Sequence, residues 1–414
     1  YRDNTMKKNK MCFLLLVLVL GSSLVWNGKA GAGELRYTPY LEINGEYNDN
    51  ILFSRNDVLD DFLYNVVPAL KLLYTTERMN LKSDAAVRFR RYTTETDFDR
   101  EDYFVNLLGN YALTERLSTR ARFYYLQNNT LESTVIDLNE PPVVDDEGPD
   151  LDDAIEPGIE RFYSEVKSYN AAVAFNYRLT ELAGLELGYR YVKRDYDFEG
   201  NTDYEVQRFR LAYLRRLESQ RDTVGARVDY DDYTSDVSDA NSYAFALIWH
   251  HLFSETMSLE SDIGARYTDR NFNRTDRTTE NWTGLADIRF VKVSETTNLK
   301  IGFKLDLQSG SGGSISNTPR FYVDFKKSLT ERYIAQCKGR LYFRRDDIDF
   351  DFGDGDIFFD IIPSLKYRLT KNFSLTLAYS YTIDHDRDLD ENQNKDRNRV
   401  WLMLEMEFPG KLQL

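Results

Sequence analysis

Residues 373–382 read FSLTLAYSYT and residues 400–408 read VWLMLEMEF. In both stretches a large apolar side chain alternates with a small, polar or charged one. A period of two places the two sets on opposite faces of a β-strand. The apolar face must be covered by lipid or by other protein layers. No segment past residue 32 has the period of a covering helix, which favours lipid.

Eight short polar turns interrupt alternating runs of this kind. Five of them read almost alike, at Leu113–Glu115, Leu179–Glu181, Ser254–Thr256, Ser294–Thr296 and Leu329–Glu331. Short turns on one side of the strands and long, variable loops on the other predict an all-β, transmembrane, antiparallel up-and-down β-barrel with short periplasmic turns and long extracellular loops. We predict about eighteen strands, at residues 36–47, 61–74, 79–91, 102–113, 117–127, 162–178, 184–194, 204–216, 223–233, 241–252, 258–268, 281–292, 298–308, 319–328, 333–345, 357–369, 373–383 and 398–408.

Aromatic side chains on the apolar faces support lipid as the surrounding phase. One set precedes the short turns and another lies at the opposite strand ends, as two interfacial girdles require. The first set is Tyr74, Tyr111, Tyr177, Tyr213, Trp249, Phe290, Phe325 and Tyr367. The second set is Tyr103, Tyr125, Tyr191, Tyr230, Tyr243, Tyr267, Phe321, Phe343, Phe359 and Tyr381.

The N-terminal segment has the pattern of a secretory signal peptide. Lysines follow Met6, the apolar stretch Cys12–Leu20 comes next, and Ala30–Ala32 forms a small-x-small cleavage site. We therefore expect residues 1–32 to be an upstream remnant plus signal peptide that is removed, and residues 33–414 to form a single barrel domain. The chain carries a net charge of −15, which argues against a nucleic-acid partner. One cysteine, Cys337, would remain, so no intrachain disulfide can form.

The polar faces of the predicted strands carry more cations than acids. An eighteen-stranded barrel is too wide for side chains to fill, so these faces should line an aqueous lumen. The pore-lining candidates are Arg88, Arg90, Arg120, Arg122, Arg178, Arg190, Arg208, Arg210, Arg227, Arg266, Arg289, Lys304, Arg340 and Lys366. Cross-strand pairs with inward acids explain many of these cations. The surplus favours anionic solutes.

The longest predicted loop, residues 128–160, is the third on the extracellular side. In general porins the third loop folds into the lumen and narrows it, whereas here it could equally cap the outside. Its constriction candidates are Asp145, Asp146, Glu147, Asp150, Asp152 and Asp153. If this loop folds inward, its acids would oppose the basic wall.

The first hairpin resembles one known group of proteins. Residues 47–54 read YNDNILFS, Asp60–Phe62 follow, and Val66–Pro68 come next. These segments are similar to the opening of the β-barrel porin families of bacterial outer membranes that are often associated with exopolysaccharide or exosortase gene clusters. The resemblance implies an outer-membrane location and a pore, and it supplies no catalytic residues.

We therefore predict an outer-membrane pore for small hydrophilic solutes or saccharides, without cofactor or metal. Its expected partners are outer-membrane lipid, lipopolysaccharide and the barrel assembly machinery, with polysaccharide as a further candidate; the oligomeric state stays open. One alternative is a structural or export conduit for exopolysaccharide or a partner protein. A distant alternative is a hydrolase at the barrel rim, where His385 lies beside Asp384 and Asp386. We do not expect an enzyme.

Overall fold

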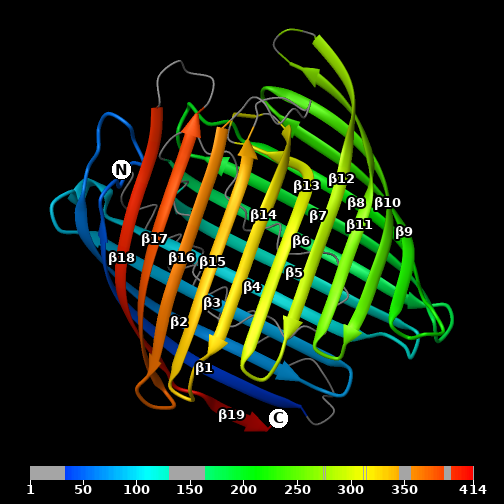
Figure 1. Ribbon diagram of the computed structural model, residues 1–414, viewed down its shortest axis with the longest axis horizontal. Helices are drawn as coiled ribbons and strands as arrows, with labels where there is room; N and C mark the ends of the chain where they lie inside the picture. Colours follow the sequence, from blue (N-terminus) through cyan, green and yellow to red (C-terminus); the bar gives the residue numbers. More distant parts are fainter. Residues whose placement is uncertain are drawn as a thin grey trace, which may run out of the picture.

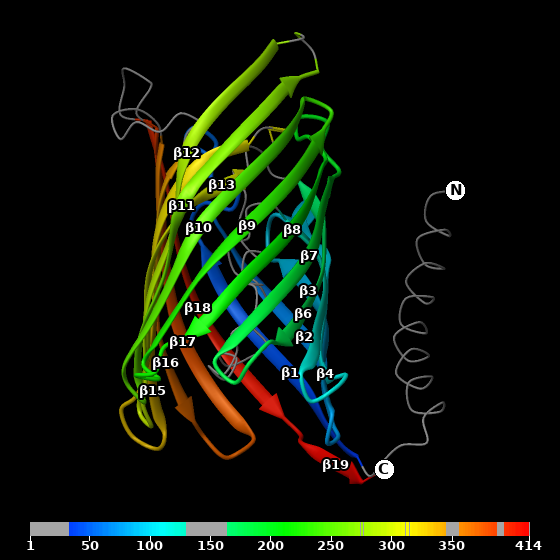
Figure 2. The ribbon, with the colours of Figure 1, turned by 90° about the vertical axis from the view of Figure 1, so that its right-hand side faces the viewer.

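The chain forms one closed antiparallel barrel. The computed structural model describes residues 33–129, 164–273, 275, 277–310, 312–313, 315–344, 356–386 and 393–413. Every paired strand is antiparallel to its partner, and β1 pairs with both β2 and β18, so the sheet closes on itself. Figures 1 and 2 show the tilted strands arranged side by side around the barrel. Barrel closure removes the unpaired edges that an open sheet would expose.

Eighteen strands make the wall, as the alternation predicts, and β19 extends the last of them. The strands are β1 (Glu34–Asn48), β2 (Asp61–Thr75), β3 (Met79–Tyr92), β4 (Arg100–Ala112), β5 (Leu117–Asn129), β6 (Glu165–Arg178), β7 (Ala183–Tyr196), β8 (Tyr204–Arg216), β9 (Asp222–Ser235), β10 (Ser238–Ser254), β11 (Met257–Phe272), β12 (Arg277–Val293), β13 (Thr297–Ser309), β14 (Ile315–Ser328), β15 (Tyr333–Arg344), β16 (Asp356–Arg368), β17 (Phe373–Asp386), β18 (Gln393–Glu407) and β19 (Gly410–Gln413). The helix among the described residues is a single 3-10 turn, η1 (Thr96–Phe98). No helix in these ranges is long and apolar enough to cross a membrane.

The recurring threonine of the short turns has a local role. In the β4–β5 turn the Oγ1 atom of Thr114 accepts hydrogen bonds from the backbone N–H groups of Arg116 and Leu117, at 3.2 and 3.0 Å. Thr180, Thr330 and Thr370 accept from the same two positions of their own turns. The hydroxyl thus occupies backbone donors that the tight turn leaves without a strand partner. This bonding explains why the turns read alike.

Removal of one turn hydroxyl should weaken the barrel by a small, local amount. We expect Thr370→Val to lower the free energy of unfolding by about 1 kcal/mol, because two backbone donors lose a net contribution of that order. Thr114→Val should cost a similar amount, and the double variant should show the sum because the turns are distant. Equilibrium unfolding in urea from lipid vesicles measures both. Thr370→Ser retains the hydroxyl, so a loss as large as that of the valine variant would contradict this role.

The strands on the loop side run further than their apolar alternation predicts. Strands β10, β11 and β12 have 17, 16 and 17 residues, and the β11–β12 hairpin rises beyond its neighbours (Figure 1). Only Asp236 and Val237 separate β9 from β10. The connection between β9 and β10 is therefore shorter than the one predicted between residues 233 and 241. Pairing continues here through polar residues after the apolar pattern has ended.

The C-terminal segment also pairs, beyond residue 408, where the last predicted strand ends. Strand β19 aligns with residues 34–37 of β1. Phe408 N donates to the carbonyl of Pro39 at 3.0 Å, and neither Pro39 nor Pro409 has an N–H to donate. At these prolines the hydrogen-bond ladder along β1 passes from β18 to β19 with a short interruption, and the chain stays beside β1.

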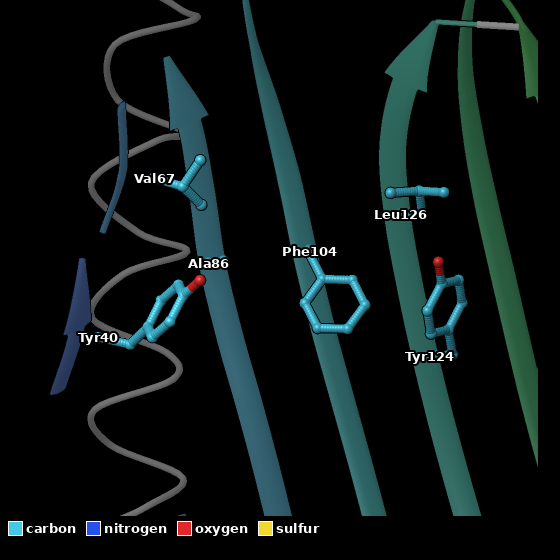
Figure 3. Close-up of a cluster of buried hydrophobic side chains, with 6 residues drawn as sticks. All are labelled: Tyr40, Val67, Ala86, Phe104, Tyr124 and Leu126. Carbon is cyan, nitrogen blue, oxygen red and sulfur yellow. The ribbon is translucent and has the colours of Figure 1, made fainter. Parts of the chain in front are cut away.

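An apolar cluster on the inner face was not predicted. Tyr40, Val67, Ala86, Phe104, Tyr124 and Leu126 come from the five neighbouring strands β1–β5 and are all buried (Figure 3). Their inward direction follows from alternation with outward residues such as Tyr64 and Phe123. The interior is therefore polar and charged for the most part, and the buried apolar cluster with the most members lies on the β1–β5 wall.

Candidate functional site: the charged interior of the barrel

The outer face of the barrel is apolar and uncovered. Leu377 and Leu402 are 53% and 50% exposed, whereas Thr376 and Ala378 beside Leu377 are 5% and 3% exposed. The same contrast occurs on β10, where Leu247 is 61% exposed and Ala246 is 1% exposed. A continuous apolar surface around a closed barrel is stable only when lipid covers it. Fold and surface together define a membrane-spanning β-barrel.

Aromatic rings on this outer face form cross-strand contacts along the loop-side girdle. Tyr230 and Tyr243 have ring centroids 5.2 Å apart, and Tyr267 lies 5.3 Å from Trp282. On the short-turn side Tyr333 and Tyr367 are 4.8 Å apart. Such pairs add to the packing of the wall, and their positions fit the two interfaces of a bilayer.

The interior contains a cavity of about 2100 Å³ that reaches the short-turn end. Glu255 and Thr256 of the β10–β11 turn and Lys371 and Asn372 of the β16–β17 turn line its mouth. Among the residues that line the cavity, eighteen are lysine or arginine and eleven are aspartate or glutamate. The lining of the cavity is thus rich in charged side chains, and cationic ones outnumber acidic ones.

The structure separates the predicted pore-lining residues into two groups. Those that line the cavity are Arg88, Arg90, Arg120, Arg122, Arg210, Arg227, Arg289 and Lys366. Those that lie outside its lining are Arg178, Arg190, Arg208, Arg266, Lys304 and Arg340. Arg178 is exposed next to a short turn, whereas Arg266 and Lys304 are buried. Alternation alone fixes which face a side chain occupies, but not whether neighbouring side chains cover it.

Arg208 and Arg266 belong to a buried network of four charges. The guanidinium of Arg208 donates to Asp231 from Nε at 2.5 Å and from Nη2 at 3.1 Å. Arg266 pairs with the same aspartate and, through Nη2, with Asp306 at 2.6 Å. The four residues come from β8, β9, β11 and β13. The side chain of Ala244 on the intervening strand β10 is small enough for the charges on β9 and β11 to meet. We name these residues the upper network.

A second network lies nearer the short turns and borders the cavity. Arg210 Nε donates to Asp229 at 2.8 Å, and Arg227 Nε lies 3.2 Å from the same carboxylate. Arg227 also pairs with Asp262, whose carboxylate is 3.6 Å from His250. In both networks two arginines meet two aspartates. Much of the cation content of this wall is therefore neutralised by cross-strand partners.

Acidic and aromatic residues on β1 and β18 also line the cavity, beside the predicted arginines and lysines. Glu42, Asn44 and Glu46 face inward from β1, and Trp401 faces inward from β18. Register pairs Glu42 with Glu405 and Glu46 with Trp401. Strict alternation over residues 42–46 and 400–404 is the signal that could have identified these positions.

The first-hairpin segment that carries the family resemblance forms hydrogen bonds across the barrel seam, the junction where β1 meets β18. Asp49 accepts hydrogen bonds from Asn398 N at 2.6 Å and from Asn398 Nδ2 at 2.8 Å. Asn50 Nδ2 donates to the carbonyl of Asp396 at 2.9 Å and to that of Ser54 at 2.8 Å. The loop after β1 is thereby tied to β18, the last long strand. We name Asp49, Asn50 and Asn398 the seam latch.

Loss of the seam latch should loosen the ends of β1 and β18. We expect Asp49→Ala to lower the free energy of unfolding by about 2 kcal/mol, because it removes two hydrogen bonds to a charged acceptor. Amide hydrogen exchange should become faster at the loop-side ends of these two strands. Asp57→Ala, in the same loop and exposed, is the matched control. Equal exchange rates in the two variants would argue against a latch.

Two of the histidines contact an acidic or an amide side chain among the described residues. His251 Nδ1 lies 2.8 Å from Asp222 on the outer face near a short turn, and His385 contacts Asn394. No group of three or more histidine, cysteine, aspartate or glutamate side chains in the described ranges could hold a metal ion. The constriction candidates in residues 145–153 and the predicted signal peptide, residues 1–32, lie outside the described residues, so both stay predictions.

Solved barrels of similar architecture are known. No protein-family model and no curated protein sequence matches the chain. The outer membrane protein OpdK from Pseudomonas aeruginosa is similar with a TM-score of 0.44 and 10% identity over 91% of this chain and 99% of that one. OccK2 (OpdF) from the same organism gives 0.46 and 9% over 92% and 98%. OccAB4 from Acinetobacter baumannii gives 0.45 and 10% over 92% and 99%. Similarity at this level does not indicate which solutes this chain binds or passes.

Proposed function

We propose that the protein is an outer-membrane pore that passes small hydrophilic solutes. The observation that carries the proposal is a closed barrel with an exposed apolar exterior and a large charged cavity at its short-turn end. Barrels of sixteen to eighteen strands leave an aqueous channel between their walls. Closed antiparallel barrels with an apolar outer band are found in bacterial outer membranes. Lipopolysaccharide and the barrel assembly machinery are then its natural partners.

The excess of cations over acids in the cavity supports a preference for anions. Low-dielectric walls concentrate the field of such a surplus in the lumen. Solutes with carboxylate or phosphate groups should therefore enter more readily than cations of the same size. Saccharides form the second solute class that we propose.

Conductance in planar bilayers tests the pore. Purified protein, refolded into a bilayer without partners, should give stepwise ion currents. Liposomes that contain it should swell in isosmotic solutions of small sugars and keep their volume in large polysaccharides. A folded barrel that neither conducts nor admits sugars would refute the proposal. It would favour a structural or export conduit that needs periplasmic partners.

A further inference from the structure

One tryptophan of the described barrel faces the cavity. Trp249 and Trp282 lie on the outer face and are 45% and 73% exposed. Trp401 lies between the outward residues Val400 and Leu402, so alternation turns its indole inward, where it lines the cavity. Its register partner on β17 is Ala378.

Hydrogen-bonding groups surround this indole. Glu46 is its register partner on β1, and Asn44 lies two residues before Glu46 on the same inner face. Asn44 is 9% exposed, and its Oδ1 atom accepts no hydrogen bond within the described part of the chain. Buried amide oxygens are nearly always partnered, so this atom calls for a donor from a bound molecule or from water.

The charges beside the indole oppose each other. The guanidinium of Arg399 lies over the Trp401 ring, 5.7 Å from its centroid, and Nη1 is 3.9 Å from Glu46 Oε1. One cation and one anion give this part of the wall no net charge. It differs in this respect from the cavity as a whole. Recognition here depends on hydrogen bonding and on the aromatic surface.

These features match the surface of a pyranose. A pyranose ring presents an apolar C–H face that can lie against an indole, and hydroxyls around its edge that both donate and accept hydrogen bonds. We propose that Trp401, Asn44, Glu46 and Arg399 form a subsite for a neutral pyranose sugar. The inference rests on the proposed pore function and names its solute. Pockets of this kind use an apolar surface for contact and a few polar groups for orientation.

Sugar block of the ion current tests the subsite. With maltose as the probe, the native pore should show concentration-dependent interruptions of the current. Trp401→Leu should raise the half-blocking concentration at least tenfold. Tyr322→Leu is the matched control, because Tyr322 also faces inward with a cation over its ring, Lys300 at 5.6 Å, but does not line the cavity. This control should be blocked like the native pore.

Two further measurements keep the test decisive if Trp401→Leu does not fold. Asn44→Ala should raise the half-blocking concentration several-fold. Maltose should change the tryptophan emission of the native barrel, and Trp401→Phe should abolish that change, because Trp249 and Trp282 face lipid. A stronger block by glucuronate than by maltose would overturn the assignment to a neutral sugar.

The failures of the two proposals are distinguishable. A native protein that folds and does not conduct refutes the pore. A native pore that conducts without block by maltose refutes only the subsite. Equal block of the native protein, Trp401→Leu and Asn44→Ala would also refute the subsite, because the sugar would then bind elsewhere in the cavity.

Discussion

Replacement of Arg266 by methionine is expected to lower the free energy of unfolding by about 3–5 kcal/mol, the cost of breaking a buried ion pair from one side. Arg266 is 1% exposed, and it bridges Asp231 and Asp306 in the upper network. Methionine preserves much of the volume but removes the cation. The two aspartates then remain buried with Arg208 as their shared partner in the network. Equilibrium unfolding in urea from lipid vesicles provides the measurement.

Two further variants separate charge from packing. Asp231→Asn and Asp306→Asn, introduced into the Arg266→Met background, remove the excess negative charge and should restore part of the lost stability. Arg36→Met removes an arginine from an exposed pair with Glu34, and such pairs contribute little. If Arg266→Met and Arg36→Met unfold at the same denaturant concentration, the upper network does not stabilise the barrel.

The fold could be predicted because its determinants are local. Alternation at residues 373–382 and 400–408 and the repeated turn sequences depend only on neighbouring residues. The strand ends are less predictable. Strands β10–β12 extend beyond their apolar runs, and polar residues on both faces give no alternation from which to predict a strand. Strand β19 is not among the predicted strands, because its pairing with β1 joins residues more than 370 positions apart in the sequence.

The interior was predictable only in part. Alternation turns Arg208, Arg227 and Arg266 inward. However, some of the acidic residues that pair with them lie on strands that are not adjacent to the strand of the arginine. Asp306 reaches Arg266 across β12, and this contact depends on how the strands are arranged in the closed barrel. The apolar cluster around Tyr124 likewise depends on contacts between inward side chains of different strands. A sequence read strand by strand contains no information about which inward side chains cover each other.

Charge reversal at the cavity should have the largest effect on function. Lys326, Lys338, Arg368 and Lys371 all line the cavity at its short-turn side. Their replacement by glutamate would change the lining from eighteen cations and eleven acids to fourteen and fifteen. We expect an anion-preferring pore to lose that preference or become cation-preferring, because the sign of the lumen field follows the surplus. The reversal potential under a KCl gradient should change sign or approach zero.

Ionic strength and one neighbouring residue supply the controls for this reversal. The difference between native and variant pores should be large at about 0.1 M salt, where the screening length is about 10 Å, and small near 1 M, where it is about 3 Å. Lys327→Glu makes the same substitution next to Lys326 on the outer face, and it should leave the reversal potential unchanged. A native pore that prefers cations would refute the anion preference outright. A variant with four glutamates that still prefers anions would place the selective charges elsewhere, among residues nearer the loop side of the barrel.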